Sequence, residues 1–505
     1  MRASGILMPV SSLPSPYGIG DFSKSAYEFV DLLKEAGQSY WQILPLGPTS
    51  YGDSPYQSFS TYAGNPYFIS LEELMEKGLL KREECVACDL GGDPRQVDYG
   101  KIYRNRLPLL RTAYERSRAG EDQEFLRFCR EQAWWLEDYT LFMALKDSFG
   151  GISWAGWPEE IRMRQPEALA ECRRRLAREQ EYYQYLQYLF FGQWERLKGY
   201  ANRQGIRIIG DIPIYVAFDS ADAWASPELF QFDGQNLPTA VAGCPPDGFS
   251  ATGQLWGNPL YRWDYHRETG YAWWIRRIAA CTKLYDVVRI DHFRGFDEYY
   301  SIPYGDLTAE HGHWEKGPGI GLFDAVRREL GQVDIIAEDL GFITDSVREL
   351  VEACGYPGMK VLEFAFDSRE EANYLPHTYT PNCVVYTGTH DNETIAGWYA
   401  GLDSKDREMA QDYMDNRRTP QEEIHWDFIH LAMMSVADLC IIPIQDYLGL
   451  DNCARMNKPS TLGCNWKWRL TENEIPPELT AKIRELTKIS FRFPGLSQDF
   501  PISPE

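Results

Sequence analysis

Eight short apolar runs, most of which end in a polar residue, limit what this chain can fold into. They lie at residues 6–9, 40–45, 206–211, 286–291, 334–338, 360–364, 383–390 and 439–445. Amphipathic segments with helical spacing separate most of these runs, for example at 23–36, 273–284, 323–330 and 344–354. Barrel strands buried on both faces have this pattern, whereas an open doubly wound sheet commonly has about five or six strands. The sequence therefore predicts an α/β fold, a closed (β/α)8 TIM barrel with helical insertion subdomains.

The gap between the second and third predicted strands is too long for a loop. It spans about 160 residues, and most of it is rich in Glu, Arg, Leu, Gln and Tyr with helical periodicity. We therefore expect residues 1–505 to form a single barrel domain with a mainly helical insertion at 66–202. Two polar stretches that contain Gly and Pro, 243–261 and 451–469, are predicted to be loops at the rim of the barrel.

The net charge disfavours two classes of partner. The chain has 51 Lys and Arg against 74 Asp and Glu, a net charge of −23, so nucleic acids and anionic membrane surfaces would be repelled. The N-terminal apolar run is too short for a signal peptide, and no stretch reaches the ~18 apolar residues of a membrane span. We therefore expect a cytoplasmic protein whose eleven cysteines are reduced thiols.

Four predicted strands end in carboxylates, at the position where barrel enzymes carry their catalytic residues. The four acids are Asp211, Asp291, Glu338 and Asp391, and two of them have an adjacent histidine, His292 and His390. A single acid at a strand end is more often a loop cap or an ion-pair partner. Four acids at the same end of one barrel make that interpretation much less favourable for the set.

Neighbouring charges predict different protonation states for two of these acids. Arg289 and Asp291 share one face of a strand, so the guanidinium is expected to lower the pKa of Asp291 and keep it ionised. If Glu338 faces Asp291 and Asp391, their negative charge raises its pKa and holds its proton. One ionised and one protonated acid on either side of a bond is the arrangement for glycoside cleavage. Asp391 would then bind sugar hydroxyls and stabilise the positively charged transition state.

Motifs for other chemistries are missing from the sequence. It contains no G-x-x-x-x-G-K-[S/T] phosphate loop, no H-E-x-x-H zinc motif and no G-x-S-x-G nucleophile motif. Cys85 and Cys88 lack further ligands nearby, so we expect no bound metal. The aromatic content of 14% fits either a large core or a surface on which sugar rings stack, and composition alone does not decide between them.

Segments around these acids resemble the core motifs of the α-amylase clan, and within it the 4-α-glucanotransferases of glycoside hydrolase family 77, the amylomaltases. The four segments are Gly210-Asp-Ile-Pro-Ile-Tyr-Val-Ala, Arg289-Ile-Asp-His-Phe-Arg-Gly, Ala337-Glu-Asp-Leu-Gly and Thr389-His-Asp-Asn-Glu-Thr. Three more resemble segments that distinguish this family from ordinary amylases: Ser50-Tyr-Gly-Asp-Ser-Pro-Tyr-Gln-Ser, Gly253-Gln-Leu-Trp-Gly-Asn-Pro-Leu-Tyr and Arg455-Met-Asn. The resemblance extends over residues 5–469, nearly the whole chain.

The resemblance implies a retaining transfer of α-1,4-glucan segments from a donor maltooligosaccharide to the 4-hydroxyl of an acceptor glucan or glucose. Asp291 would be the nucleophile of a covalent glucosyl-enzyme intermediate, Glu338 the acid/base and Asp391 the transition-state stabiliser. The residues implied to bind substrate are Tyr56, Asp211, Phe249, Trp256, Arg289, His292 and His390. The implied substrates are maltooligosaccharides and α-1,4-glucans derived from starch or glycogen, with no cofactor and no metal.

Two competing interpretations remain open from the sequence. An α-amylase-type hydrolase would use the same acids and differ only in its products. A non-catalytic glucan-binding barrel would keep the fold without the reaction, although the presence of all three acids argues against it.

Overall fold

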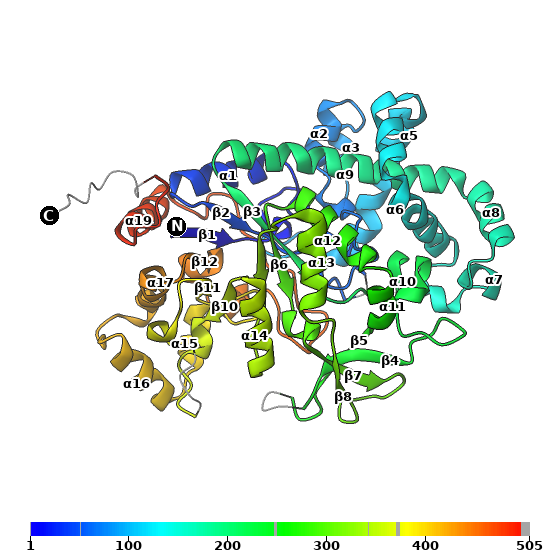
Figure 1. The fold of residues 1–505 in the computed structure, drawn as a ribbon. Coiled ribbons are helices and arrows are strands. Elements are labelled where there is room, and N and C mark those ends of the chain that lie inside the picture. The colour runs from blue at the N-terminus through cyan, green and yellow to red at the C-terminus, as the bar shows by residue number, and fades with distance from the viewer. Residues whose placement is uncertain (1, 51, 247–249, 342, 370–373, 496–505) are drawn as a thin grey trace.

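The computed structural model describes residues 2–50, 52–246, 250–341, 343–369 and 374–495. In these ranges eight parallel strands close into a barrel in the order β1, β12, β11, β10, β9, β6, β3 and β2 (Figure 1). The strands are β1 (Ala3–Leu7), β2 (Tyr40–Gln42), β3 (Arg207–Pro213), β6 (Val287–Asp291), β9 (Ile335–Ala337), β10 (Gly358–Val361), β11 (Cys383–Tyr386) and β12 (Leu439–Pro443). Each predicted apolar run overlaps one strand, so the predicted (β/α)8 barrel is confirmed.

The barrel interior is packed with apolar side chains that point away from the helices. This cluster contains Leu7, Ile209, Val287, Ile336, Met359, Val361, Val384, Tyr386 and Ile441, and no residue from a helix. Side chains alternate along a strand, so Asp211 continues the inward row that begins at Ile209. Arg289 and Asp291 continue the row that begins at Val287 in the same way. The period of two therefore places these three charged groups at the mouth of the barrel, above an apolar floor.

Amphipathic helices surround the barrel. In α1 (Lys24–Glu35) the buried residues Ala26, Phe29, Val30 and Leu33 have the i, i+3, i+4, i+7 spacing of one helix face. The other helices around the barrel are α12 (Ala272–Leu284), α13 (Ile320–Leu330), α14 (Asp345–Cys354), α15 (Ile395–Gly401), α17 (Ile424–Met434) and α19 (Pro477–Ile489). Shorter or peripheral helices are α10 (Ala221–Ala225), α11 (Trp263–Glu268), α16 (Ser404–Tyr413) and α18 (Ile444–Tyr447).

The chain between β2 and β3 forms a group of helices to one side of the barrel (Figure 1). They are α2 (Leu71–Glu76), α3 (Arg82–Val86), α4 (Tyr99–Lys101), α5 (Leu107–Ser117), α6 (Gln123–Ser148), α7 (Glu159–Arg162), α8 (Pro166–Arg175) and α9 (Ala177–Arg203). The two long helices, α6 and α9, pack against each other, and α9 also contacts α1 before the chain enters β3. Among the described residues, no helix is both long and apolar enough to cross a bilayer.

A small antiparallel sheet lies beside the barrel mouth in the order β5, β4, β7, β8. Its strands are β4 (Ala240–Cys244), β5 (Gln254–Pro259), β7 (Glu298–Pro303) and β8 (His313–Lys316). The sequence predicts a rim loop at 243–261, but β5 and the end of β4 make much of this stretch strand. Gly243 allows the close approach of the two paired strands, because a Cβ at this position would lie 2.1 Å from the carbonyl oxygen of Gln254. The second predicted rim stretch, 451–469, contains only the short 3-10 helix Asn452–Ala454.

Candidate active site

The carboxyl ends of four barrel strands bring one cluster of charged side chains together. Asp211 belongs to β3, Arg289 and Asp291 belong to β6, and Glu338 follows β9 directly. Asp391 lies in the segment between β11 and α15, and its charge acts on both Arg289 and Asp291. The structure thus places the three predicted catalytic acids, and the predicted binding residues Asp211 and Arg289, at a single mouth of the barrel.

Arg289 holds two of the acids through one nitrogen. Its Nη1 donates to Asp211 Oδ2 at 2.5 Å and lies 3.2 Å from Asp291 Oδ1. Arg289 and Asp211 are 3% and 0% exposed, so this ion pair is sealed from water, whereas Asp291 is 27% exposed. The surrounding carboxylates keep the pKa of Arg289 well above its usual value despite burial. The guanidinium therefore stays charged and fixes the direction of the Asp291 carboxylate.

The pKa of Asp291 differs from the sequence prediction. We expected Arg289 to lower it, but in the structure it is raised to about 6. Burial is the largest cause, and the negative charges of Asp211 and Asp391 add to it, which together outweigh Arg289. Because a pKa near 6 still lies below 7, Asp291 is mainly ionised at neutral pH, as a nucleophile must be.

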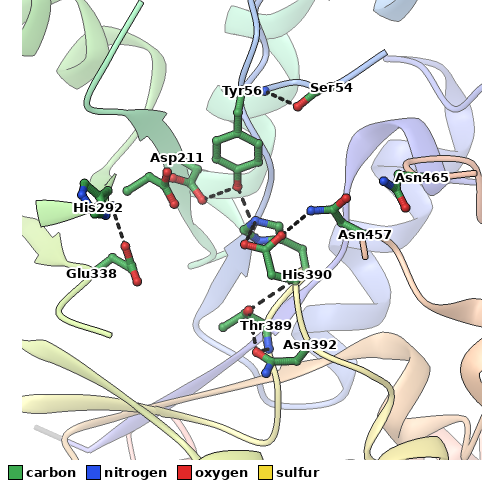
Figure 2. Close-up of polar contacts among 12 residues, drawn as sticks. Ser54, Tyr56, Asp211, His292, Glu338, Thr389, His390, Asn392, Asn457 and Asn465 are labelled. Carbon is green, nitrogen blue, oxygen red and sulfur yellow. Dashed lines mark hydrogen bonds and ion pairs between the residues drawn. The ribbon is translucent and has the colours of Figure 1, made fainter. Parts of the chain in front are cut away.

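Glu338 has the environment of a proton donor. Burial and the neighbouring charge of Asp291 raise its pKa well above the usual range, in the predicted direction. The backbone N–H of His292 donates to Glu338 Oε2 at 2.5 Å, and His292 itself has a left-handed φ of 53° (Figure 2). Asp339, the next residue, faces away and accepts the N–H of Met359 at 2.6 Å. As the alternation predicts, only one of the two adjacent acids is available at the mouth.

Asp391 is held in its ionised form by two neighbours. His390 Nε2 lies 3.3 Å from Asp391 Oδ2, and Asn457 Nδ2 donates to Asp391 Oδ1 at 2.6 Å. The charge and hydrogen bonds of these neighbours lower the pKa of Asp391 to about 2 although burial opposes them. Asp391 consequently stays negative over the whole pH range in which Asp291 and Glu338 titrate.

Tyr56 closes the cluster on the side of the loop that follows β2. Its hydroxyl donates to Asp211 Oδ2 at 2.9 Å and lies 3.4 Å from His390 Nδ1 (Figure 2). The rings of Tyr56 and His390 are stacked, with centroids 5.0 Å apart and planes 17° from parallel. Trp466, from the predicted rim stretch 451–469, lies 5.8 Å from the Tyr56 ring. The resemblance implied that Tyr56 binds substrate; the structure adds that its hydroxyl donates to Asp211 and orients that carboxylate.

Trp256 and His292 contact each other at the barrel mouth. Their rings meet edge to face at 4.8 Å, and Trp256 Nε1 donates to Gln254 Oε1 on the same strand. His292 Nε2 is buried and has no hydrogen-bond partner among the described residues. Burial lowers the pKa of His292 to about 3, so its ring is neutral at physiological pH. Phe249, which the resemblance also implies as a substrate-binding residue, lies outside the residues that the structure describes.

Asn457 is a site residue to which sequence reasoning assigned no role. Its own N–H donates to the carbonyl of His390 at 3.0 Å, and Arg455 donates through Nη2 to the carbonyl of Asp391 at 2.8 Å. Both residues belong to the Arg455-Met-Asn segment, which carried the family resemblance but no chemistry of its own. Only the return of this loop to the mouth after β12 brings them to Asp391.

The described residues contain no group of three or more His, Cys, Asp or Glu side chains arranged to hold a metal ion. The positive charge at the mouth comes from Arg289 instead. The arrangement therefore offers an ionised acid, a protonated acid and a third, permanently ionised acid around one opening.

Comparison with known proteins identifies the family. A family model described as 4-alpha-glucanotransferase matches residues 8–474. The 4-alpha-glucanotransferase of Clostridium butyricum is 49% identical over 484 residues, covering 95% of this chain and 99% of the relative. That of Thermus thermophilus is 48% identical over 500 residues, covering 97% and 99%.

A solved structure gives the same result. The amylomaltase from Streptococcus agalactiae in complex with acarbose has a TM-score of 0.94 and 42% identity, and the match covers 98% of this chain and all of that one. The amylomaltase of Corynebacterium glutamicum, at 20% identity and a TM-score of 0.79, shares the fold. The resemblance predicted from the motifs is confirmed, and this chain, a glucanotransferase, belongs to the 4-α-glucanotransferase family.

Proposed function

We propose that this enzyme moves α-1,4-glucan segments between maltooligosaccharides by a retaining double displacement, with Asp291 as nucleophile and Glu338 as acid/base. The observation that carries this assignment is the contrast between the two acids. Asp291 is fixed by Arg289 and is ionised at neutral pH, whereas the pKa of Glu338 is raised well above its usual range. Retaining cleavage requires this pairing of an ionised and a protonated acid.

The first displacement breaks the donor glycosidic bond. Asp291 attacks the anomeric carbon while the proton of Glu338 passes to the departing oxygen, which leaves with the reducing-end fragment. The positive charge that develops on the sugar ring lies beside Asp391, whose pKa of about 2 keeps it negative throughout. A covalent glucosyl ester on Asp291 results, and Glu338 is now ionised.

The second displacement runs the same steps in reverse with a different alcohol. Glu338 removes the proton of the acceptor 4-hydroxyl, that oxygen attacks the anomeric carbon, and Asp291 departs. Two inversions at one carbon give net retention. Asp211, Arg289, His292 and His390 bind the glucose unit that is transferred, and the unpartnered Nε2 of His292 is available for one of its hydroxyls.

Transfer predominates over hydrolysis when the glucosyl-enzyme intermediate reacts with an acceptor sugar rather than with water. Trp256 is half-buried and supplies aromatic surface at the mouth on which an acceptor ring can stack and displace solvent, whereas Trp466 is 5% exposed and lies against the Tyr56 ring. Phe249 is proposed for the same side on the family resemblance alone.

The proposed partners are maltooligosaccharides and α-1,4-glucans derived from starch or glycogen. A mainly helical insertion at 66–202, no bound metal and a cytoplasmic location remain predictions from the sequence.

The test is to incubate the purified enzyme with maltotriose and follow product lengths by chromatography together with total reducing ends. Glucose plus a ladder of longer maltooligosaccharides at nearly constant reducing ends is the expected result, and Asp291→Asn is expected to abolish the ladder. Rising reducing ends without longer products would make the enzyme a hydrolase. Repeating the assay with a chelator checks the metal prediction, because loss of activity would contradict it.

A further inference from the structure

Behind the segment that carries His390 and Asp391 lies a second set of acids that the proposed reaction does not use. Residues 387–394 connect β11 to α15, and we call them the β11–α15 segment. Glu363 follows β10 in the 3-10 turn Leu362–Phe364, and Asp446 follows β12 in α18. Both side chains are buried, with exposed fractions of 8% and 1%.

Asp446 holds the two ends of the segment. Its Oδ2 accepts the Thr387 hydroxyl at 2.5 Å, and its Oδ1 accepts the N–H of Ile395 at 2.9 Å. Each carboxylate oxygen thus receives a donor, which is how a buried ionised carboxylate is stabilised. Thr387 follows β11 directly and Ile395 is the first residue of α15. The Asp446 side chain therefore connects the two ends of the β11–α15 segment.

Glu363 contacts the segment at Thr387, Gly388 and Glu393, and its carboxyl has fewer donors than that of Asp446. Its N–H donates to the Thr387 carbonyl at 3.2 Å, and its Oε2 accepts the N–H of Glu393 at 3.3 Å. Oε1 is buried without a partner among the described residues. This oxygen rests against Gly388, because a Cβ built there would lie 2.6 Å from it. A side chain at position 388 would therefore displace the buried Glu363 carboxyl.

The charges that face Glu363 oppose its ionisation. Asp446 on α18 and Glu393 in the segment are both acids, and the cation Arg455, after the 3-10 helix Asn452–Ala454, counters them in part. Arg455 is already engaged: its Nη1 lies 3.5 Å from Glu393 Oε1 and its Nη2 donates to the Asp391 carbonyl. Burial, together with two acidic neighbours and only weak compensation by one long hydrogen bond and Arg455, raises the pKa of Glu363 well above the usual value, so its carboxyl keeps its proton.

We propose that Glu363, whose carboxyl lies against Gly388 and accepts the N–H of Glu393, is a positioning residue that sets the β11–α15 segment so that His390 and Asp391 face the sugar. It touches no reacting atom and acts through the backbone of Gly388 and Glu393. The inference rests on the proposed role of Asp391. The positioning role of Glu363 would explain why a buried acid with an unpartnered oxygen lies beside the segment that carries Asp391.

Two variants of Glu363 with side chains of similar size distinguish the effect of its hydrogen bond from the effect of its volume. Glu363→Gln keeps a neutral head that accepts from Glu393, whereas Glu363→Met keeps the volume and loses the acceptor. Displacing a reacting group by about 1 Å costs up to ~100-fold, so we expect Glu363→Met to lower kcat for maltotriose about tenfold or more with KM within about threefold. Glu363→Gln is expected to keep kcat within about twofold of wild type, because no charge is lost.

Acarbose inhibition and thermal melting complete the experiment. Glu363→Met is expected to bind acarbose more weakly while its melting temperature stays close to that of Glu363→Gln. A Met variant with unchanged kcat, or a Gln variant as impaired as the Met variant, would overturn the proposal. If the Met variant does not fold, Gly388→Ala decides: a reduced kcat supports the proposal, and an unchanged kcat contradicts it. Asp391→Asn is assayed in parallel, because activity in that variant would reject the proposed function itself.

Discussion

At the scale of single residues, the protonation state of each acid depends on how far neighbouring donors and cations offset the rise in pKa that burial causes. Asp391 receives an amide and an imidazole and has a pKa of about 2. Asp291 receives one guanidinium that it shares with Asp211, and its pKa is about 6. Glu338 receives one backbone N–H, and burial together with the charge of Asp291 raises its pKa well above the usual range. Burial raises the pKa of all three acids, and it is outweighed by the neighbouring groups at Asp391 alone of the three.

These values predict a bell-shaped pH profile for kcat/KM. As the pH falls through about 6, Asp291 gains a proton and ceases to be a nucleophile, so the rate drops on the acid side. As the pH rises through the raised pKa of Glu338, the general acid is lost and the rate drops again. Initial rates of maltotriose disproportionation from pH 4 to 9 measure both limbs, which belong to the interacting pair rather than to either acid alone.

The control for this profile is enzyme held at each pH and then assayed at pH 7, which separates titration from denaturation. A flat profile between pH 4 and 7 would contradict the acid limb and, with it, the environment assigned to Asp291.

Asn457 supplies a second prediction at this scale. Asn457→Ala removes the 2.6 Å hydrogen bond to Asp391 Oδ1 and leaves the backbone bond to the His390 carbonyl in place. A bond that orients the stabilising acid matters most in the transition state, so kcat is expected to fall about tenfold with little change in KM. Steady-state kinetics on maltotriose measure this split. Asn416→Ala, which removes a side-chain bond to Asp427 away from the mouth, is the control and is expected to leave both constants unchanged.

At the scale of elements, β5 presents alternate side chains to different surroundings. Trp256 meets the edge of His292, while Leu255, its neighbour, is 40% exposed. Trp256→Ala is expected to weaken acceptor binding and admit water, so reducing ends rise faster relative to the oligosaccharide ladder. The ratio of the two signals on maltotriose measures this. Leu255→Ala on the same strand is expected to keep the wild-type ratio, and a ratio unchanged in both variants would remove Trp256 from the acceptor side.

The helices between β2 and β3 are joined to the barrel by a buried ion pair. Arg106, just before α5, donates to Asp21 Oδ2 at 2.8 Å and to the Ile69 carbonyl at 2.7 Å, and both charged side chains are 0% exposed. Arg106→Met leaves the Asp21 carboxyl buried without its cation. The free energy of unfolding is expected to fall by about 3–5 kcal/mol, measured by urea denaturation.

The matched control for Arg106 is an exposed pair on α6. Arg127 and Glu124 are about 60% exposed, and Arg127→Met is expected to change the free energy of unfolding by less than about 1 kcal/mol. Equal effects of the two substitutions would mean that the buried pair does not join the helices to the barrel.

At the scale of the whole molecule, the barrel and the position of the proposed catalytic acids were predictable because both depend on short-range patterns. An apolar run marks a strand, and the period of two fixes which of its residues, such as Asp211 and Arg289, point inward. Asn457 was not predictable, since its position depends on how a loop after β12 folds back over β11. The pKa of Asp291 was predicted with the wrong sign, because a sequence shows the neighbouring guanidinium but not the loss of solvent.

The same loss of solvent around these acids lowers the free energy of unfolding at neutral pH. The folded-state pKa values of Asp291 and Asp446 are about 6, and those of Glu338 and Glu363 are raised further, whereas the unfolded chain has ordinary values near 4. A folded state that binds protons more tightly than the unfolded state is stabilised at low pH. The free energy of unfolding that these acids contribute therefore falls as the pH rises from about 4 through their folded-state pKa values.

Asp291→Asn tests this balance between stability and function. The amide cannot ionise, so the variant avoids the cost of burying a charge, and at pH 8 it is expected to melt about 1–4 °C above wild type while having no transferase activity. The difference is expected to shrink as the pH falls from 8 toward 4.5, where wild-type Asp291 is itself protonated in the folded state. Scanning calorimetry across this range measures the effect, with Glu349→Gln on the exposed face of α14 as the control. A variant that melts at or below the wild-type temperature at pH 8 would show that Arg289 compensates the charge of Asp291 fully, and that the mouth of the barrel stores no electrostatic strain.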